Sequence, residues 1–158
     1  MIILTSFHKS RSILKRLQSR SPNIYSVARK QPAGYSYPNL PFLAAIDIHG
    51  QKINLHGVED PINSYRRTLY EYYNSVCDDI MQWVVSLESQ NVDIICCWCP
   101  YSISTKEQIR VHGTFVCHTG LIGKIINEYR PDIEVFMDTD RAMRMIKDYK
   151  PIFKTLIM

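Results

Sequence analysis

The chain has 158 residues, of which 46% are hydrophobic and 22% are charged. This balance is typical of a soluble globular protein, and it excludes a disordered or fibrous chain. The length fits one compact domain, so we expect residues 1–158 to form a single domain. No segment approaches the ~20 consecutive apolar residues that a membrane-spanning helix requires, and we therefore expect no membrane association.

Cysteine usage favours a reducing compartment. The chain has five cysteines, an odd number, and Cys96, Cys97 and Cys99 lie almost side by side in the sequence. A secreted disulfide framework would use an even number of cysteines at wider spacings. We therefore expect a cytoplasmic protein whose thiols are free or bound to a metal.

Positive charge is concentrated at the start of the chain. Seven of the 19 basic residues and none of the 15 acidic residues precede Asp47, although the net charge of the whole chain is only +4. Clustered positive charge suggests a polyanionic partner, such as nucleic acid or a phosphorylated small molecule. A solvated basic face that is balanced by acidic residues elsewhere in the fold explains the pattern equally well.

The first third of the sequence predicts two strands and a helix, separated by loops. Apolar residues over 1–5 indicate a short strand, and apolar positions at helical spacing indicate an amphipathic helix over 10–20. Alternating residues over 23–28 predict a second strand, which a proline-rich, packed loop over 31–41 follows. The pattern over 46–55 indicates a hairpin.

The clearest predicted element is a long helix. Asp60 and Pro61 are a typical N-cap and first helical residue. Apolar residues then repeat every three or four positions from Ile62 to Leu87, which predicts one continuous amphipathic helix. The remaining predicted elements are a buried strand over 92–97, a polar loop over 100–113, a helix over 117–129, a strand over 133–137 and a helix over 138–149.

This alternation of strands and helices is typical of an α/β fold. We predict a three-layer domain in which helices flank a mostly parallel sheet. Such sheets bind ligands outside the carboxyl ends of their strands, next to the amino termini of helices. We therefore expect the functional site at that edge.

Cysteine and histidine residues gather at the expected edge. Cys96, Cys97 and Cys99 end the predicted central strand, and Cys117 and His118 begin the next helix. At a helix amino terminus the positive end of the helix dipole and the free N–H groups favour a reactive thiolate.

Three interpretations of these residues are open. In the first, Cys96, Cys99, Cys117 and His118 bind zinc, since Cys96 and Cys99 have the C-x-x-C spacing of zinc sites. In the second, Cys117 is a catalytic nucleophile and His118 accepts its proton. His112 is an alternative histidine in both. In the third, the strand cysteines are small core residues that face opposite sides of the sheet.

Further residues at the expected edge are candidates for binding a ligand. They are Ser6, Arg29, Lys30, Trp98, Cys99, Thr119 and Gly120. Backbone N–H groups of Thr119 and Gly120, at the start of a helix, can hold a phosphate. Ser6, after the first predicted strand, and Arg29 and Lys30, after the second, can bind anionic groups. The indole of Trp98 can stack on a base, although a packed tryptophan is the commoner outcome.

The segment C-W-C-P over 97–100, followed by Cys117 and His118, resembles the bacterial and phage family called domain of unknown function 488 and its small relatives. The two predicted strands before residue 30 and the predicted tyrosine-rich helix also fit this family, so the resemblance extends over 1–130. Members commonly have arginine where this chain has Thr119, and their loop between the two motifs is shorter. The resemblance implies the fold and the site, and it points to nucleotide or nucleic-acid metabolism.

We predict a cytoplasmic protein of phage or bacterial type that binds a nucleotide-like or phosphorylated ligand at this edge, with thiol-based catalysis left open. The first alternative is a nucleic-acid-binding module that uses the basic segment 9–30 and a structural zinc site. The second is a small protein–protein inhibitor, which would expose an aromatic patch. That patch is predicted at Tyr35, Tyr37, Tyr70 and Tyr73.

Overall fold

Four parallel strands form the centre of the structure, a computed structural model that describes residues 1–98 and 118–137. The strands are β1 (Ile2–Ser6), β2 (Asn23–Ser26), β3 (Asp93–Cys97) and β4 (Val135–Met137), in the spatial order β2-β3-β1-β4. The predicted α/β fold with a parallel sheet is confirmed. The predicted loop over 100–113 and the predicted helix over 138–149 lie outside the described residues.

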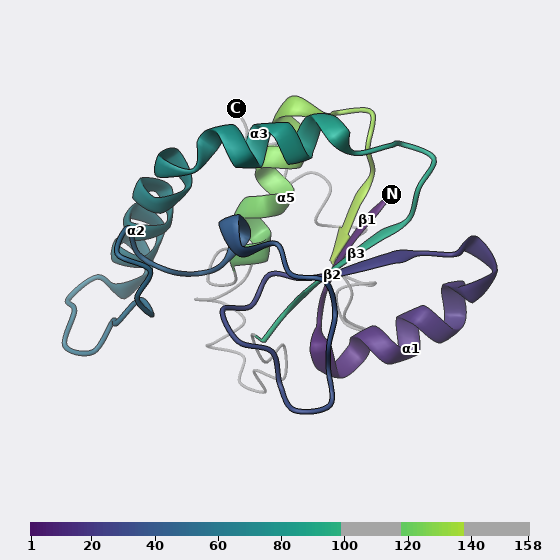
Figure 1. Cartoon of the computed structure of the whole chain (residues 1–158). Helices are drawn as coiled ribbons and strands as arrows, with labels where there is room; N and C mark the ends of the chain where they lie inside the picture. The colour runs from purple at the N-terminus through teal and green to yellow at the C-terminus, as the bar shows by residue number, and fades with distance from the viewer. Residues whose placement is uncertain (99–117, 138–158) are drawn as a thin grey trace.

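Helices cover both faces of the sheet (Figure 1). On one face, α1 (Phe7–Leu17) packs through Phe7 and Ile13 against the isoleucines of the strands. On the opposite face, α3 (Cys77–Ser86) and α5 (His118–Tyr129) pack against the other side of the same strands. None of the helices within the described residues is long and apolar enough to cross a membrane.

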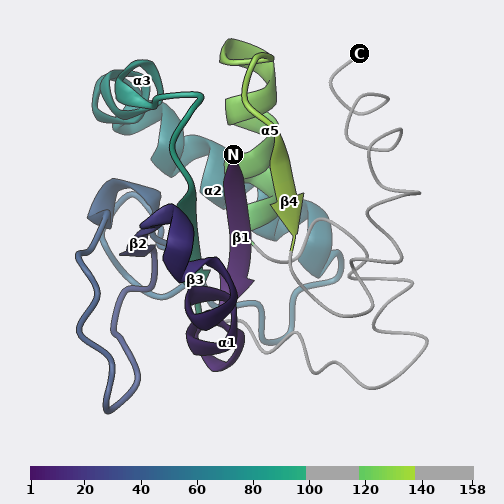
Figure 2. The ribbon, with the colours of Figure 1, turned by 90° about the vertical axis from the view of Figure 1, so that its right-hand side faces the viewer.

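The placement of the helices follows from the order of the strands. The chain passes from β1 through α1 to β2, beyond β3, and then returns across the sheet through α3 and α5 to β4. Right-handed crossovers place connections that run in opposite directions on opposite faces of a parallel sheet. α1 therefore lies apart from α3 and α5, and the arrows of β1 and β4 point the same way in Figure 2.

The predicted single long helix is wrong, because the structure has two helices in its place. α2 (Pro61–Ser75) ends where Val76 leaves the helical conformation, with φ −119° and ψ 24°, and α3 begins at Cys77. The hydroxyl of Ser75 donates to the carbonyl of Tyr72 at 2.6 Å. Such a local side-chain bond competes with the helical hydrogen bonds, and the β-branched Val76 adds little helix propensity.

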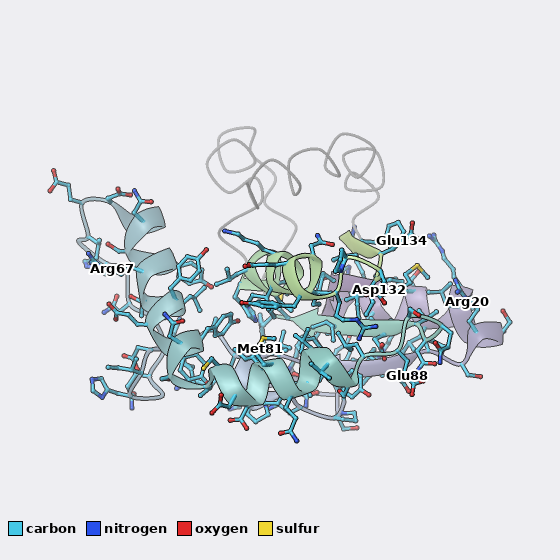
Figure 3. All side chains as sticks on the ribbon, turned by 90° about the horizontal axis from the view of Figure 1, so that it is seen from above. Arg20, Arg67, Met81, Glu88, Asp132 and Glu134 are labelled. Carbon is cyan, nitrogen blue, oxygen red and sulfur yellow. The ribbon has the colours of Figure 1, made fainter. Side chains whose placement is uncertain are left out.

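The break changes the direction of the chain, so α3 lies over the sheet and α2 runs beyond it (Figure 1). Both helices contact the turn Pro41–Leu43: the hydroxyl of Tyr73 in α2 donates to the carbonyl of Leu43 at 3.0 Å, and the ring of Trp83 in α3 packs on Phe42. α2 thus extends away from the sheet on the side opposite α1, and Arg67 and Arg20 lie at opposite ends of the molecule in Figure 3.

The predicted hairpin over 46–55 is reduced to a single antiparallel bridge between Ile46 and Lys52. The Oδ1 atom of Asp47 accepts hydrogen bonds from the N–H groups of His49 and Gln51, at 2.8 and 2.9 Å. The aspartate side chain therefore holds a tight turn and takes hydrogen bonds that a longer strand ladder would use.

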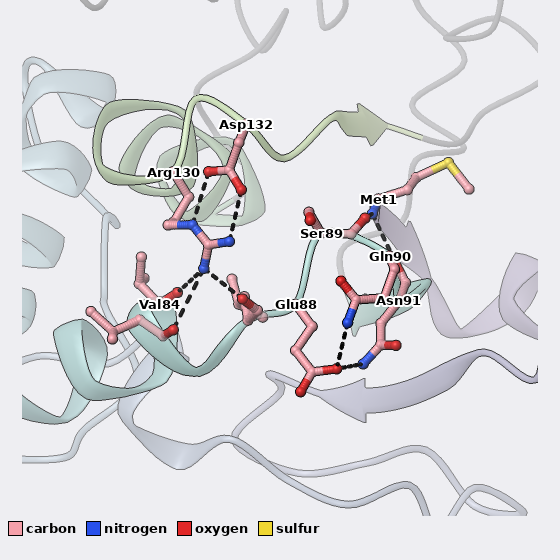
Figure 4. A network of polar contacts seen from close by, with 10 residues as sticks. Met1, Val84, Glu88, Ser89, Gln90, Asn91, Arg130 and Asp132 are labelled. Carbon is pink, nitrogen blue, oxygen red and sulfur yellow. Dashed lines mark hydrogen bonds and ion pairs between the residues drawn. The ribbon is translucent and has the colours of Figure 1, made fainter.

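Arg130, just after α5, joins the end of that helix to the end of α3 (Figure 4). Its Nη1 atom donates to the carbonyl oxygens of Val84 and Leu87, at 3.3 and 2.5 Å. Its Nε and Nη2 atoms donate to the carboxylate of Asp132. A guanidinium at these positions supplies a donor to carbonyl groups at the C-terminus of α3, where helical hydrogen bonds run out; the carbonyl of Val84 also accepts from the N–H of Leu87.

Replacing Arg130 with Ala should lower the midpoint of thermal unfolding by several degrees and speed amide exchange at the end of α3. The reason is that the carbonyls of Val84, Val85 and Leu87 lose the guanidinium as a donor, and only that of Val84 has a second donor among the described residues, the N–H of Leu87. Asp132→Ala is the matched control, since it removes the ion pair but leaves the contacts with the carbonyls. Exposed ion pairs contribute little to stability, so this control should unfold close to the unmodified chain. Equal losses in both variants would assign the effect to the ion pair instead.

Candidate functional site

The carboxyl ends of β1 and β3 lie side by side at one edge of the sheet. Ser6 at the end of β1 is in register with Cys97 at the end of β3. α1 follows β1 on one face, whereas α5, the next described element after β3, packs on the other face. Where neighbouring parallel strands connect to opposite faces, a crevice opens between their ends, and α/β proteins bind ligands there. The edge between β1 and β3 is thus the candidate site.

On the face that α1 covers, the sheet changes from apolar to polar towards this edge. The two adjacent rows across β1, β3 and β2 are Ile3–Ile94–Ile24 and Thr5–Cys96–Ser26. All three residues of the second row are fully buried. Polar groups are expensive to bury, so two buried hydroxyl groups on either side of a buried thiol, at a position where the neighbouring row is all isoleucine, mark this edge as unusual.

The buried polar groups of this row are only partly satisfied. The hydroxyl of Ser26 accepts a hydrogen bond from the N–H of Ala28 at 3.2 Å. Burial raises the pKa of the Cys96 thiol to about 12, although a hydrogen bond with Ser10 opposes the shift. The hydroxyl of Thr5 has no partner among the described residues. Native proteins pair nearly all buried polar groups, so packing alone does not account for Thr5.

α1 begins directly at the end of β1, without a loop. Ser6 is its N-cap in an extended conformation, with φ −97° and ψ 157°, and the side chain makes no capping hydrogen bond. The N–H groups of Phe7, His8 and Lys9 in the first turn have no carbonyl partner in the helix, and they carry partial positive charge. No acidic residue lies in that turn. The start of α1 can therefore accept an anion at the crevice.

His118 lies in the first turn of α5, where the Cys-His motif predicted it. The residue is 3% exposed, and its Nε2 atom lies 3.2 Å from the carbonyl oxygen of Val27, just beyond β2. A carbonyl oxygen only accepts, so Nε2 carries a proton, and in the neutral ring Nδ1 is an acceptor. Among the described residues, Nδ1 has no hydrogen-bond partner. Nε2 therefore holds the ring in place, and Nδ1 can accept a hydrogen bond from a ligand.

The structure places the described candidates for ligand binding close to the ends of β1, β2 and β3. The buried ones are Ser6, Thr119 and Gly120, and the exposed ones are Arg29, Lys30 and Trp98. Trp98 directly follows β3, and its side chain is 56% exposed, so the indole is not a core residue. Cys99 and Cys117 lie outside the described residues, and their roles stay predictions.

The two strand cysteines face opposite sides of the sheet. Cys96 belongs to the apolar cluster beneath α1, and Cys97 belongs to the cluster beneath α3 and α5. Cys97, rather than Cys96, thus shares its face with the helix that carries His118. The described part of the chain contains no group of three or more metal-binding side chains. The zinc site of Cys96, Cys99, Cys117 and His118 stays a prediction, because two of its ligands are not described.

The predicted aromatic patch is not a single exposed surface. Tyr73 is 4% exposed and belongs to the core. Tyr35 and Tyr37 pack on Phe7 at the start of α1: Tyr35 meets its ring edge-to-face at 5.1 Å between centroids, and Tyr37 is stacked on it at 5.9 Å. Tyr70 is exposed on α2, where its hydroxyl accepts a hydrogen bond from Lys124. The tyrosines therefore belong to three separate environments.

Thr5, Ser10 and Ser26 were not among the residues predicted from the sequence. A signal for two of them exists, because Thr5 and Ser26 each stand two positions after an isoleucine that faces α1. Strand alternation calls for another apolar residue at both positions. A polar residue at the last position that faces α1, in the two strands on either side of β3, thus indicates the ligand edge.

Comparisons of the chain with protein-family models, with curated proteins and with solved structures gave no match. The resemblance of the 97–100 and 117–118 motifs to a known family accordingly stays a prediction. The structure itself defines the class as an α/β protein with a parallel sheet and a polar carboxyl edge.

Proposed function

We propose that the protein binds a small phosphorylated, nucleotide-like ligand at the edge between β1 and β3. The observation that carries this proposal is the reversal of connections at Ser6 and Cys97, which creates the crevice that α/β folds use for ligands. The unpartnered polar atoms on the two sides of this edge, Thr5 Oγ1 and His118 Nδ1, support it.

The phosphate would meet the start of α1. The N–H groups of Phe7, His8 and Lys9 supply donors there, and the helix dipole favours a negative charge. Arg29 and Lys30, both exposed just after β2, add positive charge at the same edge. No carboxylate competes for these groups within the first 46 residues of the chain.

The rest of the ligand would meet neutral groups. The Nδ1 atom of His118 is an acceptor in the neutral ring, so it suits a hydroxyl or N–H group of the ligand. The exposed indole of Trp98 offers a flat surface for a base. A phosphate, a hydroxyl and a flat ring together describe a nucleotide-like molecule. Catalysis by Cys117, with His118 as the proton acceptor, stays a hypothesis that depends on residues outside the described ranges.

Titration of the 15N-labelled protein with AMP tests this proposal. We expect the amide signals of Phe7, His8 and Lys9 to shift, because those N–H groups would bind the phosphate. Inorganic phosphate should shift the same signals at higher concentration, and adenosine should not shift them. Replacing Arg29 and Lys30 with Gln should weaken AMP binding about tenfold, which corresponds to about 1.4 kcal/mol.

Lys52→Gln with Arg67→Gln is the matched control, since it removes two exposed charges from other parts of the chain. It should bind AMP like the unmodified protein. Absence of any shift in the first turn of α1 at millimolar AMP would overturn the proposal. Equal weakening by the control would reduce the effect to net charge.

A further inference from the structure

The exposed surface of α1 contains cations and no carboxylate. Beyond the first turn its exposed charged residues are Arg11, Lys15 and Arg16, and Arg20 extends the series into the 3-10 turn Gln18–Arg20 that follows. We call these four residues the basic face. The first acidic residue of the chain is Asp47, so neither the helix nor its flanking segments supply a negative charge.

The opposite side of α1 is fully used in packing. Phe7 and Ile13 are buried against the sheet, and Leu14 and Leu17 pack half-buried against the same cluster. The helix therefore has no apolar surface left to insert into a lipid bilayer, as a membrane-binding amphipathic helix would need. The fold directs the basic face outwards, because the apolar stripe can only point to the core.

The cations of the basic face form no ion pair with the described side chains. No described carboxylate lies within ion-pair distance of Arg11, Lys15, Arg16 or Arg20, although Arg20 lies near Glu134 in Figure 3. Arg11 is held in place instead by neutral groups: Nη2 donates to the carbonyl of Gly34 at 2.8 Å, and the guanidinium lies 4.5 Å from the centre of the Tyr35 ring. These contacts orient the guanidinium and leave its charge uncompensated.

We infer that the basic face of α1 binds the phosphate backbone of a nucleic acid without regard to sequence. α1 has 11 residues and is therefore about 17 Å long. A DNA duplex carries one negative charge for about every 1.7 Å of its axis, so a stretch as long as α1 presents about ten phosphates. Three exposed cations on α1 and a fourth on the turn that follows it suit such an extended array of charge, whereas a small anion needs a convergent site.

This inference is independent of the proposed ligand site. The basic face runs along the outside of α1 to Arg20, away from the crevice where the helix begins at Phe7. A long polyanion and a small phosphorylated molecule would therefore contact different residues. A negative result for the ligand site leaves nucleic-acid binding by the basic face untouched, and the reverse also holds.

Fluorescence anisotropy with a short, labelled DNA duplex of random sequence tests the inference on the full chain. If four phosphates are contacted, the logarithm of the association constant should fall against the logarithm of the salt concentration with a slope of about −3.6. Binding should weaken about 100-fold between about 50 mM and about 200 mM salt. Duplexes of unrelated sequence should bind equally well.

Two matched double variants assign the binding to the basic face. Lys15→Gln with Arg16→Gln removes two of its cations, and the slope should become shallower by about 2. Lys52→Gln with Arg67→Gln removes two exposed charges elsewhere, and Figure 3 shows Arg67 at the end of the molecule opposite Arg20. This second variant has the same net charge and should keep the salt dependence of the unmodified chain.

Three outcomes would overturn the inference. The first is a duplex affinity that does not change with salt. The second is equal weakening by both double variants, which would reveal attraction by net charge alone. The third is binding to vesicles that contain phosphatidylserine with no binding to the duplex, which would identify a membrane surface instead. AMP shifts confined to the first turn of α1 would leave the inference intact, because they report on the other site.

Discussion

Replacing Ile94 with Ala is expected to lower the free energy of unfolding by about 3 kcal/mol. Ile94 is fully buried at the centre of β3, between Ile3 of β1 and Ile24 of β2. The row packs beneath α1, so truncation removes apolar area and leaves a cavity between the sheet and that helix. Neither neighbouring strand can move in to fill the space, because β3 is hydrogen-bonded on both sides.

Chemical denaturation, followed by circular dichroism, measures this change. Ile94→Val removes one methyl group and should cost about 1 kcal/mol, since it keeps the β-branched shape. Ile48→Ala is the surface control, because Ile48 is 54% exposed, and its effect should stay within about 0.5 kcal/mol. A loss in the Ile94→Ala protein no larger than that of the surface control would show that α1 does not pack on β3 as described.

Alkaline pH is expected to destabilise the protein through Cys96. Burial raises the pKa of this thiol to about 12 in the folded chain, whereas its ordinary value is 9.0. Below about pH 9 the thiol is protonated in both states, and its burial then has no cost that depends on pH. Above that pH the unfolded chain releases the proton and the folded chain does not. Stability should therefore fall by about 1.4 kcal/mol per pH unit between about 9 and about 12.

Cys96→Ala isolates this contribution. Burial also raises the pKa values of Tyr25 and Tyr72, so the unmodified protein and the variant should share part of the alkaline loss. The difference between their two slopes belongs to Cys96. Cys77→Ala is the control, since Cys77 is exposed and its removal should leave the slope unchanged. Identical slopes in the unmodified protein and the Cys96→Ala protein would contradict the buried, protonated thiol.

The strands and most helices were predictable from local patterns. β3 was expected over 92–97 and is observed over Asp93–Cys97, because a continuous apolar run suits a strand that is covered on both faces. The helix over 10–20 was placed too late by three residues, since α1 begins at Phe7. Ser6 is the N-cap, but its side chain makes no capping hydrogen bond, and β1 runs directly into the helix. Only the direction that the chain must take over the sheet explains it.

The periodicity of apolar residues does not predict the break between α2 and α3 at Val76. Apolar residues keep a helical spacing through this position, and the same pattern fits one helix or two. The deciding contacts are long-range: Tyr72 and Tyr73 bond to the carbonyls of Pro41 and Leu43, some 30 positions earlier in the chain. These bonds hold the end of α2 on the turn Pro41–Leu43, and Trp83 of α3 packs on Phe42 of the same turn, so both helices are positioned by a segment far away in the sequence.

The sequence predicts that the candidate site lies at the carboxyl edge of the sheet, but it does not predict how the residues are arranged there. The alternation of strands and helices placed Ser6, Trp98 and His118 at the carboxyl ends of the strands. Register decided which cysteine faces which helix, and no local pattern reports register between strands that lie about 90 residues apart. The same pairing brought Thr5 and Ser26 to either side of Cys96, which no single segment indicates.

The amino-acid sequence by itself determined the fold class, the chemistry available at the carboxyl edge and the excess of positive charge before Asp47. These properties follow from composition and from periodicities of two and of three to four residues, which act over one element at a time. The tertiary structure alone decided that α1 turns its cations to solvent, that Cys96 is buried against that helix, and that His118 is held by the carbonyl of Val27. Each of these depends on contacts between elements that only the folded chain brings together.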